Sequence, residues 1–405
     1  MKICIFGGTF DPVHEGHIHI AKNALSEFKL DKVIFMPSGN SYMKKDVSPA
    51  IHRYNMLKLA LEEYPEFELS DIEIKREGYT YTKDTIEEFK ANHPDDELFF
   101  LIGSDTLFMI EKWYEPEYLF HNLHFLVADR NDEEMNKKSE ELKDKFNAKI
   151  DFLCCDFLDI SSSEIREEFK KLTIDETFDK ANIDNIEIKN ICSKNKRYII
   201  ENHLYRELSE KEMVMLLSKD LKESRLIHTL GVMDQAVKLA KVYNVDTKKA
   251  TVAALLHDCA KYLPMDEKLA ICERNFEKLN PIESKDEALL HAKAGKWLAY
   301  EKYGVKDQEI LDAIKYHTTG RPDMNMLEKI IFISDYIEIG RTHSDKLPMY
   351  RMIVNVDIDL VCKNICKDTL DYLKSIKEDK EIDPMTIETY EYYKKFIAER
   401  DNKDK

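Results

Sequence analysis

The chain has 405 residues, which is long for one domain and sufficient for two. Its formal net charge of −17 disfavours binding to nucleic acids or anionic membranes, although a local cationic pocket can still take a small anionic substrate. No run approaches the ~18 apolar residues of a membrane span, no signal peptide is evident, and no cysteine pair has CxxC spacing. We therefore expect a cytoplasmic protein with reduced thiols and with no nucleic-acid or membrane partner.

The first half of the chain alternates apolar strands with amphipathic helices. A helix is predicted from about residue 16, with Ile18, Ala21, Leu25 and Phe28 on one face, and further helices over 53–64 and 82–93. The predicted strands are 2–6, 32–37, 67–74, 97–103, 124–130 and 149–155. Continuous apolar strands separated by helices indicate a parallel sheet covered on both faces. The prediction is an α/β, Rossmann-like, doubly wound domain over residues 1–208.

From residue 209 the strand pattern stops and helical periodicity continues almost to the end. Ser209 and Glu212 form a capping-box signature at the first of these helices. The further predicted helices are 224–243, 247–262, 285–303, 307–316, 325–340 and 355–377. The charged last stretch is expected to fray, and residues 171–196 are assigned no structure. Residues 209–405 are thus predicted to form a second, all-α domain.

Two glycines, Gly7 and Gly8, follow the first strand directly and allow backbone N–H groups to approach an anion. The next helix points its N-terminus at the same place, where the helix dipole favours phosphate. His14 and His17 flank this terminus and could stabilise charge that grows in a transition state. Taken alone, a histidine in such a place is more often a cap or a packing residue.

The stretch "GGTFDPVHEGH" resembles the HxGH motif of the nucleotidylyltransferase superfamily. Further stretches resemble the bacterial nicotinate-nucleotide adenylyltransferases in the same order, up to residue 205. They are "MPSGNSYMKKD", "HRYNML", "REGYTYTKDTI", "FFLIGSDTL", Trp113, "VADR", "DISSSEIR" and "YIIENHLY".

This resemblance implies adenylyl transfer from ATP to nicotinate mononucleotide, which gives deamido-NAD and pyrophosphate. It implies catalytic roles for His14, His17 and Lys44. The residues implied to bind ATP are Gly8, Thr9, Phe10, His17, Gly103, Asp105, Ser162, Ser163 and Arg166. Those implied to bind the mononucleotide are Lys44, Tyr81, Thr82, Asp105 and Trp113, with Trp113 stacked on the pyridine ring. Ser162 and Ser163 are expected to cap a helix that faces the ATP phosphates.

The chemistry would be a direct displacement at phosphorus, in which positioning and charge stabilisation dominate. Magnesium would arrive on the ATP phosphates and would need no protein cage. His19 lies two residues beyond His17 and therefore faces elsewhere on the helix. The family usually has Pro-Pro-His before its lysine, whereas this chain has Ser41-Tyr42-Met43, so Lys44 and Lys45 both remain candidates for the motif lysine.

In the second half, His257 and Asp258 follow an apolar run that predicts a buried helix, where an adjacent His-Asp pair is costly unless something binds it. Other histidines and an aspartate lie on, or at the ends of, predicted helices. The predicted metal ligands are His228, His257, Asp258, His291, His317 and Asp335. Converging between helices, they would hold two divalent cations, with Asp258 as the bridge, although any one histidine alone could be a core residue.

This pattern resembles the HD-domain metallophosphohydrolases, and "RLIHTLGV", "LLHDCAKY" and "HTTGRPDMNMLEKIIFISDYIEIGR" resemble their YqeK subgroup over residues 209–375. The resemblance implies symmetrical hydrolysis of diadenosine tetraphosphate to two ADP, with a dinuclear iron centre. The ligand types suit iron, manganese or zinc. Asp258 and Lys261 would be catalytic, and Lys261 and Arg341 would bind phosphate. After Arg341 the chain reads "THSDKLPMYR" where the family more often has Phe-Pro-Gly.

The sequence thus predicts a bifunctional enzyme of NAD biosynthesis and nucleotide hydrolysis. Its substrates would be ATP, nicotinate mononucleotide and diadenosine tetraphosphate. Two alternatives stay open for the second half: a metal-bound nucleotide sensor that regulates the first half, or a hydrolase of another nucleotide. A homo-oligomer is compatible with the sequence.

Overall fold

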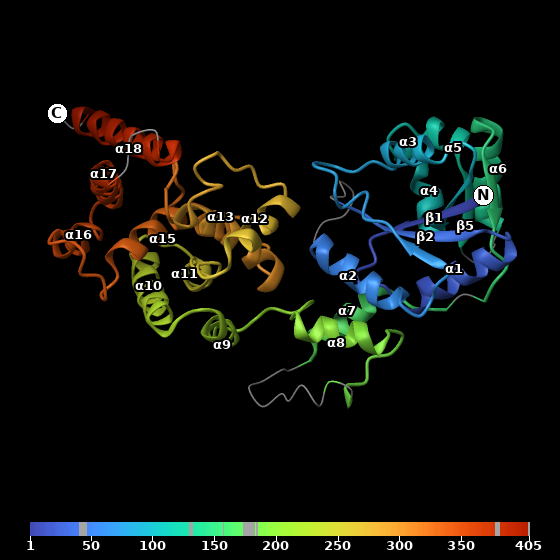
Figure 1. The fold of residues 1–405 in the computed structure, drawn as a ribbon, viewed down its shortest axis with the longest axis horizontal. Helices are drawn as coiled ribbons and strands as arrows, with labels where there is room; N and C mark the ends of the chain where they lie inside the picture. Colours follow the sequence, from blue (N-terminus) through green and yellow to red (C-terminus); the bar gives the residue numbers. More distant parts are fainter. Residues whose placement is uncertain are drawn as a thin grey trace. The chain divides into compact units, whose positions relative to one another are not determined.

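The computed structural model describes residues 1–39, 47–128, 133–156, 158–172, 183, 185–376 and 381–403. These residues divide into two compact units, Met1–Arg206 and Glu207–Lys405, each with its own core (Figure 1). Within the described ranges, every helix is too short or too polar to cross a lipid bilayer.

The N-terminal unit is built on a parallel sheet of six strands in the order β3-β2-β1-β4-β5-β6. The strands are β1 (Lys2–Gly8), β2 (Lys32–Pro37), β3 (Phe67–Leu69), β4 (Glu97–Gly103), β5 (His124–Ala128) and β6 (Lys149–Phe152). The order reverses between β1 and β4, and in open α/β sheets the carboxyl ends of the strands at such a switch point are where ligands bind. This arrangement confirms the doubly wound α/β fold.

Helices cover both faces of this sheet, as the two groups of ribbons flanking the strands in Figure 1 show. Along β1, Cys4 and Phe6 point into one core, whereas Ile3 and Ile5 point into the other. The first core holds α1 (Glu15–Glu27), α2 (Ala50–Leu61), α7 (Ser162–Lys170) and α8 (Ser193–Glu201). The second holds α3 (Thr82–Asn92), α4 (Ser104–Met109), the 3₁₀ turn η1 (Ile110–Lys112), α5 (Pro116–Asn122) and α6 (Glu133–Phe146).

The edge strands are shorter than the sequence predicts. The strand expected over 67–74 ends at Leu69, because the chain turns away and Ile72 packs against the second core from outside the sheet. The strand expected over 149–155 ends at Phe152. The strand β5 ends at Ala128, and residues 129 and 130 lie outside the described residues.

The C-terminal unit is helical and surrounds a single core, which confirms the second part of the predicted fold class. Its helices are α9 (Glu210–Asp220), α10 (Glu223–Val242), α11 (Thr247–Leu256), α12 (Met265–Arg274), α13 (Glu287–Lys302), α14 (Gln308–Tyr316), α15 (Met326–Ile337), α16 (Leu347–Ile353), α17 (Ile358–Ile376) and α18 (Pro384–Lys403). The capping box of Ser209 and Glu212 starts α9 as predicted.

Three expectations for this unit are wrong. The helix expected over 247–262 ends at Leu256, so His257 and Asp258 lie in the turns that follow it rather than inside it. The helix expected over 325–340 ends at Ile337. The charged C-terminal stretch forms α18 instead of fraying, because its Tyr393 and Ile397, four residues apart, are both buried.

Candidate functional site

β1 ends at Gly8, so Gly7 and Gly8 lie at the end of the strand rather than after it, and the glycine loop (residues 9–13) follows at the carboxyl edge of the sheet. A Cβ at Gly8 would lie 3.0 Å from the ring of Phe10, a close contact that the glycine avoids. Phe10 has a φ of 51° and is 2% exposed, and its ring packs edge-on against Phe6. The buried ring of Phe10 therefore anchors the loop to the core. Phe10 could meet a nucleotide through its backbone, with Thr9 next to it on the loop and Gly8 at the end of β1.

His14 and His17 lie together at the start of α1. His14 is the N-cap residue, its backbone N–H donates to Nδ1 of His17 at 3.2 Å, and the two ring centroids are 3.7 Å apart. Burial lowers the pKa of His14 to about 4, so this imidazole is neutral at physiological pH. A Cβ at Gly16 would lie 3.0 Å from Nδ1 of His14, which explains the glycine between the histidines. His19 faces away and bonds the carbonyl oxygen of Asp156.

A second group of predicted site residues lies where β4 ends. Gly103 is the N-cap residue of α4, and the exposed Asp105 accepts a hydrogen bond from the backbone of Thr106 at 2.8 Å. A Cβ at Gly103 would lie 2.8 Å from Oδ1 of Asp105. Since β1 and β4 are neighbours in the sheet, Gly103 and Asp105 lie at the same edge as the glycine loop.

The serine segment holds the glycine loop in place. The cap of α7 is Ser161, whose Oγ accepts from the backbone of Glu164, so the expectation that Ser162 and Ser163 are the capping residues is wrong. Ser162 instead donates to the carbonyl oxygen of Pro12 at 2.9 Å. Arg166 donates to the carbonyl oxygen of Asp11 at 2.6 Å and to the hydroxyl of Ser163 at 3.0 Å.

The residues expected to hold the mononucleotide lie around the start of α3 and the end of η1. Tyr81 is the N-cap residue of α3, next to Thr82, and its ring lies 4.9 Å from that of Tyr114. Trp113 is half-buried and meets Phe100 edge-on, with ring centroids 6.1 Å apart. Lys44 lies outside the described residues.

Arg53 was not predicted as a site residue, although it belongs to the "HRYNML" stretch. It is 2% exposed and donates to the carbonyl oxygens of Thr9 at 2.9 Å, Ser38 at 2.7 Å and Ser48 at 2.9 Å. One guanidinium thus fixes the glycine loop together with both ends of the segment that contains Lys44.

In the C-terminal unit, the structure brings all the predicted metal ligands together. His228 comes from α10 and His291 from α13, while Asp335 comes from α15. His257 and Asp258 follow α11 directly, and His317 follows α14. Potential ligand atoms lie within 4.8 Å of one another in three overlapping groups, namely His228-His257-Asp258, His257-His317-Asp335 and Asp258-His291-His317. Asp258 joins the first group to the third, which suits a bridging carboxylate.

The donor set fits divalent cations. Nδ1 of three histidines donates to a backbone carbonyl: His257 to Ala254 at 2.6 Å, His291 to Glu287 at 3.3 Å and His317 to Ile314 at 2.7 Å. This leaves each Nε2 for a metal. Nε2 of His257 is buried and has no hydrogen-bond partner among the described residues. Burial also lowers the pKa of His291 to about 4, which keeps its imidazole in the neutral form that binds metals.

Cationic side chains surround this cluster. Lys261 lies 3.5 Å from Oδ1 of Asp258, and Arg341 lies 2.8 Å from Oδ1 of Asp335. Arg225, which the sequence analysis missed, lies 2.9 Å from Oδ2 of Asp258. Its place one turn before His228 on α10 was the available signal. Glu338 was also missed, and it lies three residues after Asp335.

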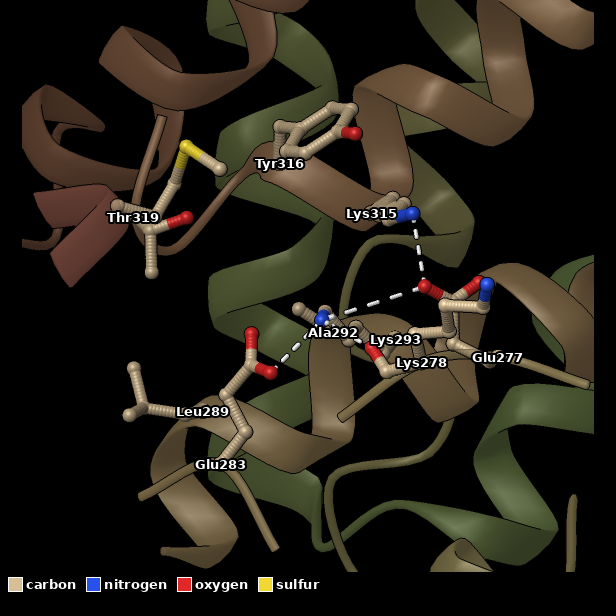
Figure 2. A pocket seen from close by; sticks show the side chains of 10 residues that line it. Glu277, Lys278, Glu283, Leu289, Ala292, Lys293, Lys315, Tyr316 and Thr319 are labelled. Atoms are coloured by element: carbon tan, nitrogen blue, oxygen red, sulfur yellow. Dashed lines mark hydrogen bonds and ion pairs between the residues drawn. The ribbon is translucent and has the colours of Figure 1, made fainter. Parts of the chain in front are cut away.

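A separate cavity of about 180 Å³ is lined by residues that include Glu277, Glu283, Lys293 and Lys315 (Figure 2). None of the predicted metal ligands lines it, and at 100° per residue Lys293 points about 200° around α13 from His291. Lys293 pairs with Glu283 at 2.7 Å, and Lys315 pairs with Glu277 at 2.7 Å. Its charges are therefore paired within the protein, and the cavity is distinct from the metal cluster.

Comparison with known proteins agrees with both units. A cytidylyltransferase-like family model matches residues 5–168, and an HD domain model matches residues 225–340. The HD domain and the clustered histidines and aspartates indicate that the C-terminal unit binds divalent metal. A protein of Clostridium tetani named "Probable nicotinate-nucleotide adenylyltransferase" is 43% identical over 175 residues, which is 42% of this chain and 88% of that protein.

Two relatives span both units, and each is named "Probable nicotinate-nucleotide adenylyltransferase/Ap4A hydrolase". The one from Mycoplasma genitalium is 33% identical over 341 residues, which is 84% of this chain and 88% of the relative. The one from Mycoplasma pneumoniae is 29% identical over 388 residues, which is 93% of this chain and 100% of the relative. The chain therefore belongs to the family of nicotinate-nucleotide adenylyltransferase/Ap4A hydrolases.

Proposed function

We propose that residues 1–208 transfer the adenylyl group of ATP to nicotinate mononucleotide, and that residues 209–405 hydrolyse diadenosine tetraphosphate symmetrically to two ADP. The observation that supports the first activity is the paired His14 and His17 at the start of α1, which follows the glycine loop after β1 at the switch point of the sheet. The convergence of the metal-ligand side chains from separate helices supports the second. Both reactions would take place in the cytoplasm.

In the first reaction, a phosphate oxygen of the mononucleotide attacks the α-phosphorus of ATP, and the bond to the bridging oxygen breaks to release pyrophosphate. Gly8, Thr9 and the backbone of Phe10 would cradle the phosphates, which magnesium would accompany. His17 and His14 would donate hydrogen bonds to the phosphoryl oxygens as negative charge moves onto the leaving group. Lys44 would neutralise charge in the same place, and Ser162, Ser163 and Arg166 would hold the loop.

The mononucleotide would lie beyond the end of β4. Gly103 and Asp105 would contact nucleotide there, and Tyr81, Thr82 and Trp113 would enclose the pyridine ring.

In the second reaction, a water oxygen adds to one of the two central phosphorus atoms, and the bond to the oxygen between them breaks to release ADP on each side. When bound, two iron or other divalent cations would activate the water and withdraw charge from the phosphoryl oxygens. Asp258 would bridge the cations, and His228, His257, His291, His317 and Asp335 would complete the set. The positively charged side chains of Lys261 and Arg341 would bind the phosphate chain.

The first assignment is tested with His17→Ala in the full-length chain, assayed for deamido-NAD formed from ATP and nicotinate mononucleotide. The rate should fall by about 10²-fold or more, as when a donor to a developing charge is lost. His19→Ala is the matched control, since His19 lies on the same helix but bonds Asp156. A near-normal rate for His17→Ala would contradict the assignment, and nicotinamide mononucleotide as the better acceptor would correct the substrate.

The second assignment is tested by metal removal. Chelator treatment should abolish hydrolysis of diadenosine tetraphosphate, iron(II) should restore it, and adenylyl transfer should persist with magnesium. ADP should be the sole nucleotide product, and ATP with AMP would instead show asymmetrical cleavage. Tight binding of the dinucleotide without any ADP would favour a regulatory module over a hydrolase.

A further inference from the structure

One histidine of the metal cluster differs from the others in its second hydrogen bond. Nδ1 of His228 lies 3.1 Å from Oε1 of Glu338, while its Nε2 lies 2.9 Å from the ligand oxygen of Asp335. In contrast, His257, His291 and His317 direct Nδ1 at neutral backbone carbonyls. His228 is thus the one predicted histidine ligand that the structure pairs with a carboxylate through Nδ1.

The Glu338 carboxylate is held by a backbone hydrogen bond and lies in space left by two glycines. It is 4% exposed, and its Oε2 accepts from the backbone N–H of Gly340 at 2.5 Å. A Cβ at Gly231, one turn after His228 on α10, would lie 2.6 Å from Oε2, and a Cβ at Gly340 would lie 3.0 Å from it. Both glycines therefore leave the space that this carboxylate fills.

The backbone around Glu338 is fixed as well. Arg351 of α16 donates to the carbonyl oxygens of Ile337 at 2.7 Å, Glu338 at 2.7 Å and Arg341 at 3.0 Å. These three hydrogen bonds to the end of α15 and the turn after it limit the positions that the carboxylate can take. The contact with His228 is thus supported from α10, from the turn after α15 and from α16.

We propose that Glu338 is a positioning residue that orients His228 and makes one half of the dinuclear centre bind its cation more tightly than the other half. This inference rests on the metal centre proposed above. A carboxylate that accepts the Nδ1 proton fixes the tautomer with Nε2 toward the metal and increases the basicity of that nitrogen. A backbone carbonyl fixes the tautomer with a smaller effect on basicity. Since His228 belongs to the group with His257 and Asp258, the added affinity falls on that side.

The test is a calorimetric titration of the metal-free, full-length chain with Mn²⁺, comparing wild type with Glu338→Gln. The wild type should bind two ions with unequal affinities. The variant should lose about 10- to 100-fold in affinity at the tighter site and keep the weaker one, the range expected for loss of an outer-shell partner. A matched control is Glu328→Gln, because Glu328 is also buried on α15 but pairs with Arg321. This control should leave both affinities unchanged.

Gly231→Ala provides an independent variant, since its Cβ would displace the Glu338 carboxylate while the glutamate itself remains. It should reproduce the loss at the tighter site, and it decides the question if Glu338→Gln does not fold. A wild-type chain that binds no Mn²⁺ would overturn the proposed centre itself. Two bound ions with unchanged affinities in the variants, or an equal loss at both sites, would overturn the role of Glu338 alone.

Discussion

The hydroxyl of Tyr205 donates a hydrogen bond to Oδ1 of Asp11 at 2.8 Å, although the two residues are 194 positions apart. Asp11 is 5% exposed, and its other carboxylate oxygen accepts from the backbone of Ser48 at 2.9 Å. Burial raises the pKa of Tyr205 well above its ordinary value, and the Asp11 charge adds to this, so the hydroxyl stays protonated and can donate. The end of the N-terminal unit thus holds the loop that carries the phosphate cradle.

We expect Tyr205→Phe to lower the free energy of unfolding of the N-terminal unit by about 1–3 kcal/mol, because it leaves a buried carboxylate oxygen without its donor. Adenylyl transfer should fall, while hydrolysis of diadenosine tetraphosphate should not change. Denaturant unfolding and both assays on the full-length chain measure this. Tyr198→Phe is a suitable control, since that hydroxyl bonds His52 and Asn55 rather than the loop.

The Arg53 guanidinium joins three backbone segments of the N-terminal unit. Arg53→Lys keeps the charge but cannot reach the carbonyl oxygens of Thr9, Ser38 and Ser48 together. The kcat of adenylyl transfer should fall by at least about tenfold, because misplaced loops no longer align the reacting phosphates. Steady-state kinetics with ATP as the varied substrate measure the effect. Wild-type kcat in a folded Arg53→Lys variant would show that the loops do not depend on this residue.

Gly16→Ala separates helix stability from site geometry. Alanine at Gly16, the second residue of α1, should stabilise the helix relative to glycine by up to about 0.5 kcal/mol, the lower end of the range for a helix interior. Its Cβ, however, would lie 3.0 Å from Nδ1 of His14 and must push that imidazole aside. We therefore expect a folded variant, verified by its thermal unfolding, with reduced adenylyl transfer. Full activity in this variant would mean that the ring position of His14 is not critical.

The pKa of His14 predicts how acid affects stability. Burial lowers it from 6.5 to about 4, so between these values the unfolded chain takes up a proton that the folded chain does not. This contribution to stability is fully present above pH 6.5 and is lost as the pH falls toward 4. It amounts to about 2 kcal/mol between pH 7 and pH 5. Urea unfolding of the metal-free chain measures the effect. Between pH 7 and pH 5, the free energy of unfolding should fall less in His14→Gln than in wild type. An equal fall in both proteins would contradict the lowered pKa of His14.

Much of the fold follows from local patterns. The continuous apolar run over residues 3–6 predicts a strand covered on both faces, and the sheet confirms it, with Ile3 and Ile5 in one core and Cys4 and Phe6 in the other. The sequence predicts the ends of the edge strands and of some helices less accurately. Residues 70–74 alternate like a strand because Ile72 packs on the core, but the chain has already left the sheet there.

The amino-acid sequence by itself determined the identity and order of the histidines and aspartates that converge in the C-terminal unit, since their types and spacing are properties of the chain. It also determined the Gly7-Gly8 pair, which ends β1, and the His14 and His17 pair. Only the tertiary structure decided that Glu338 contacts His228, that Arg53 joins three backbone segments, and that Tyr205 holds Asp11. The physical reason is that the contacts of His228 with Glu338, of Arg53 with Thr9 and of Tyr205 with Asp11 join residues far apart in the chain, so these pairings depend on how strands and helices pack.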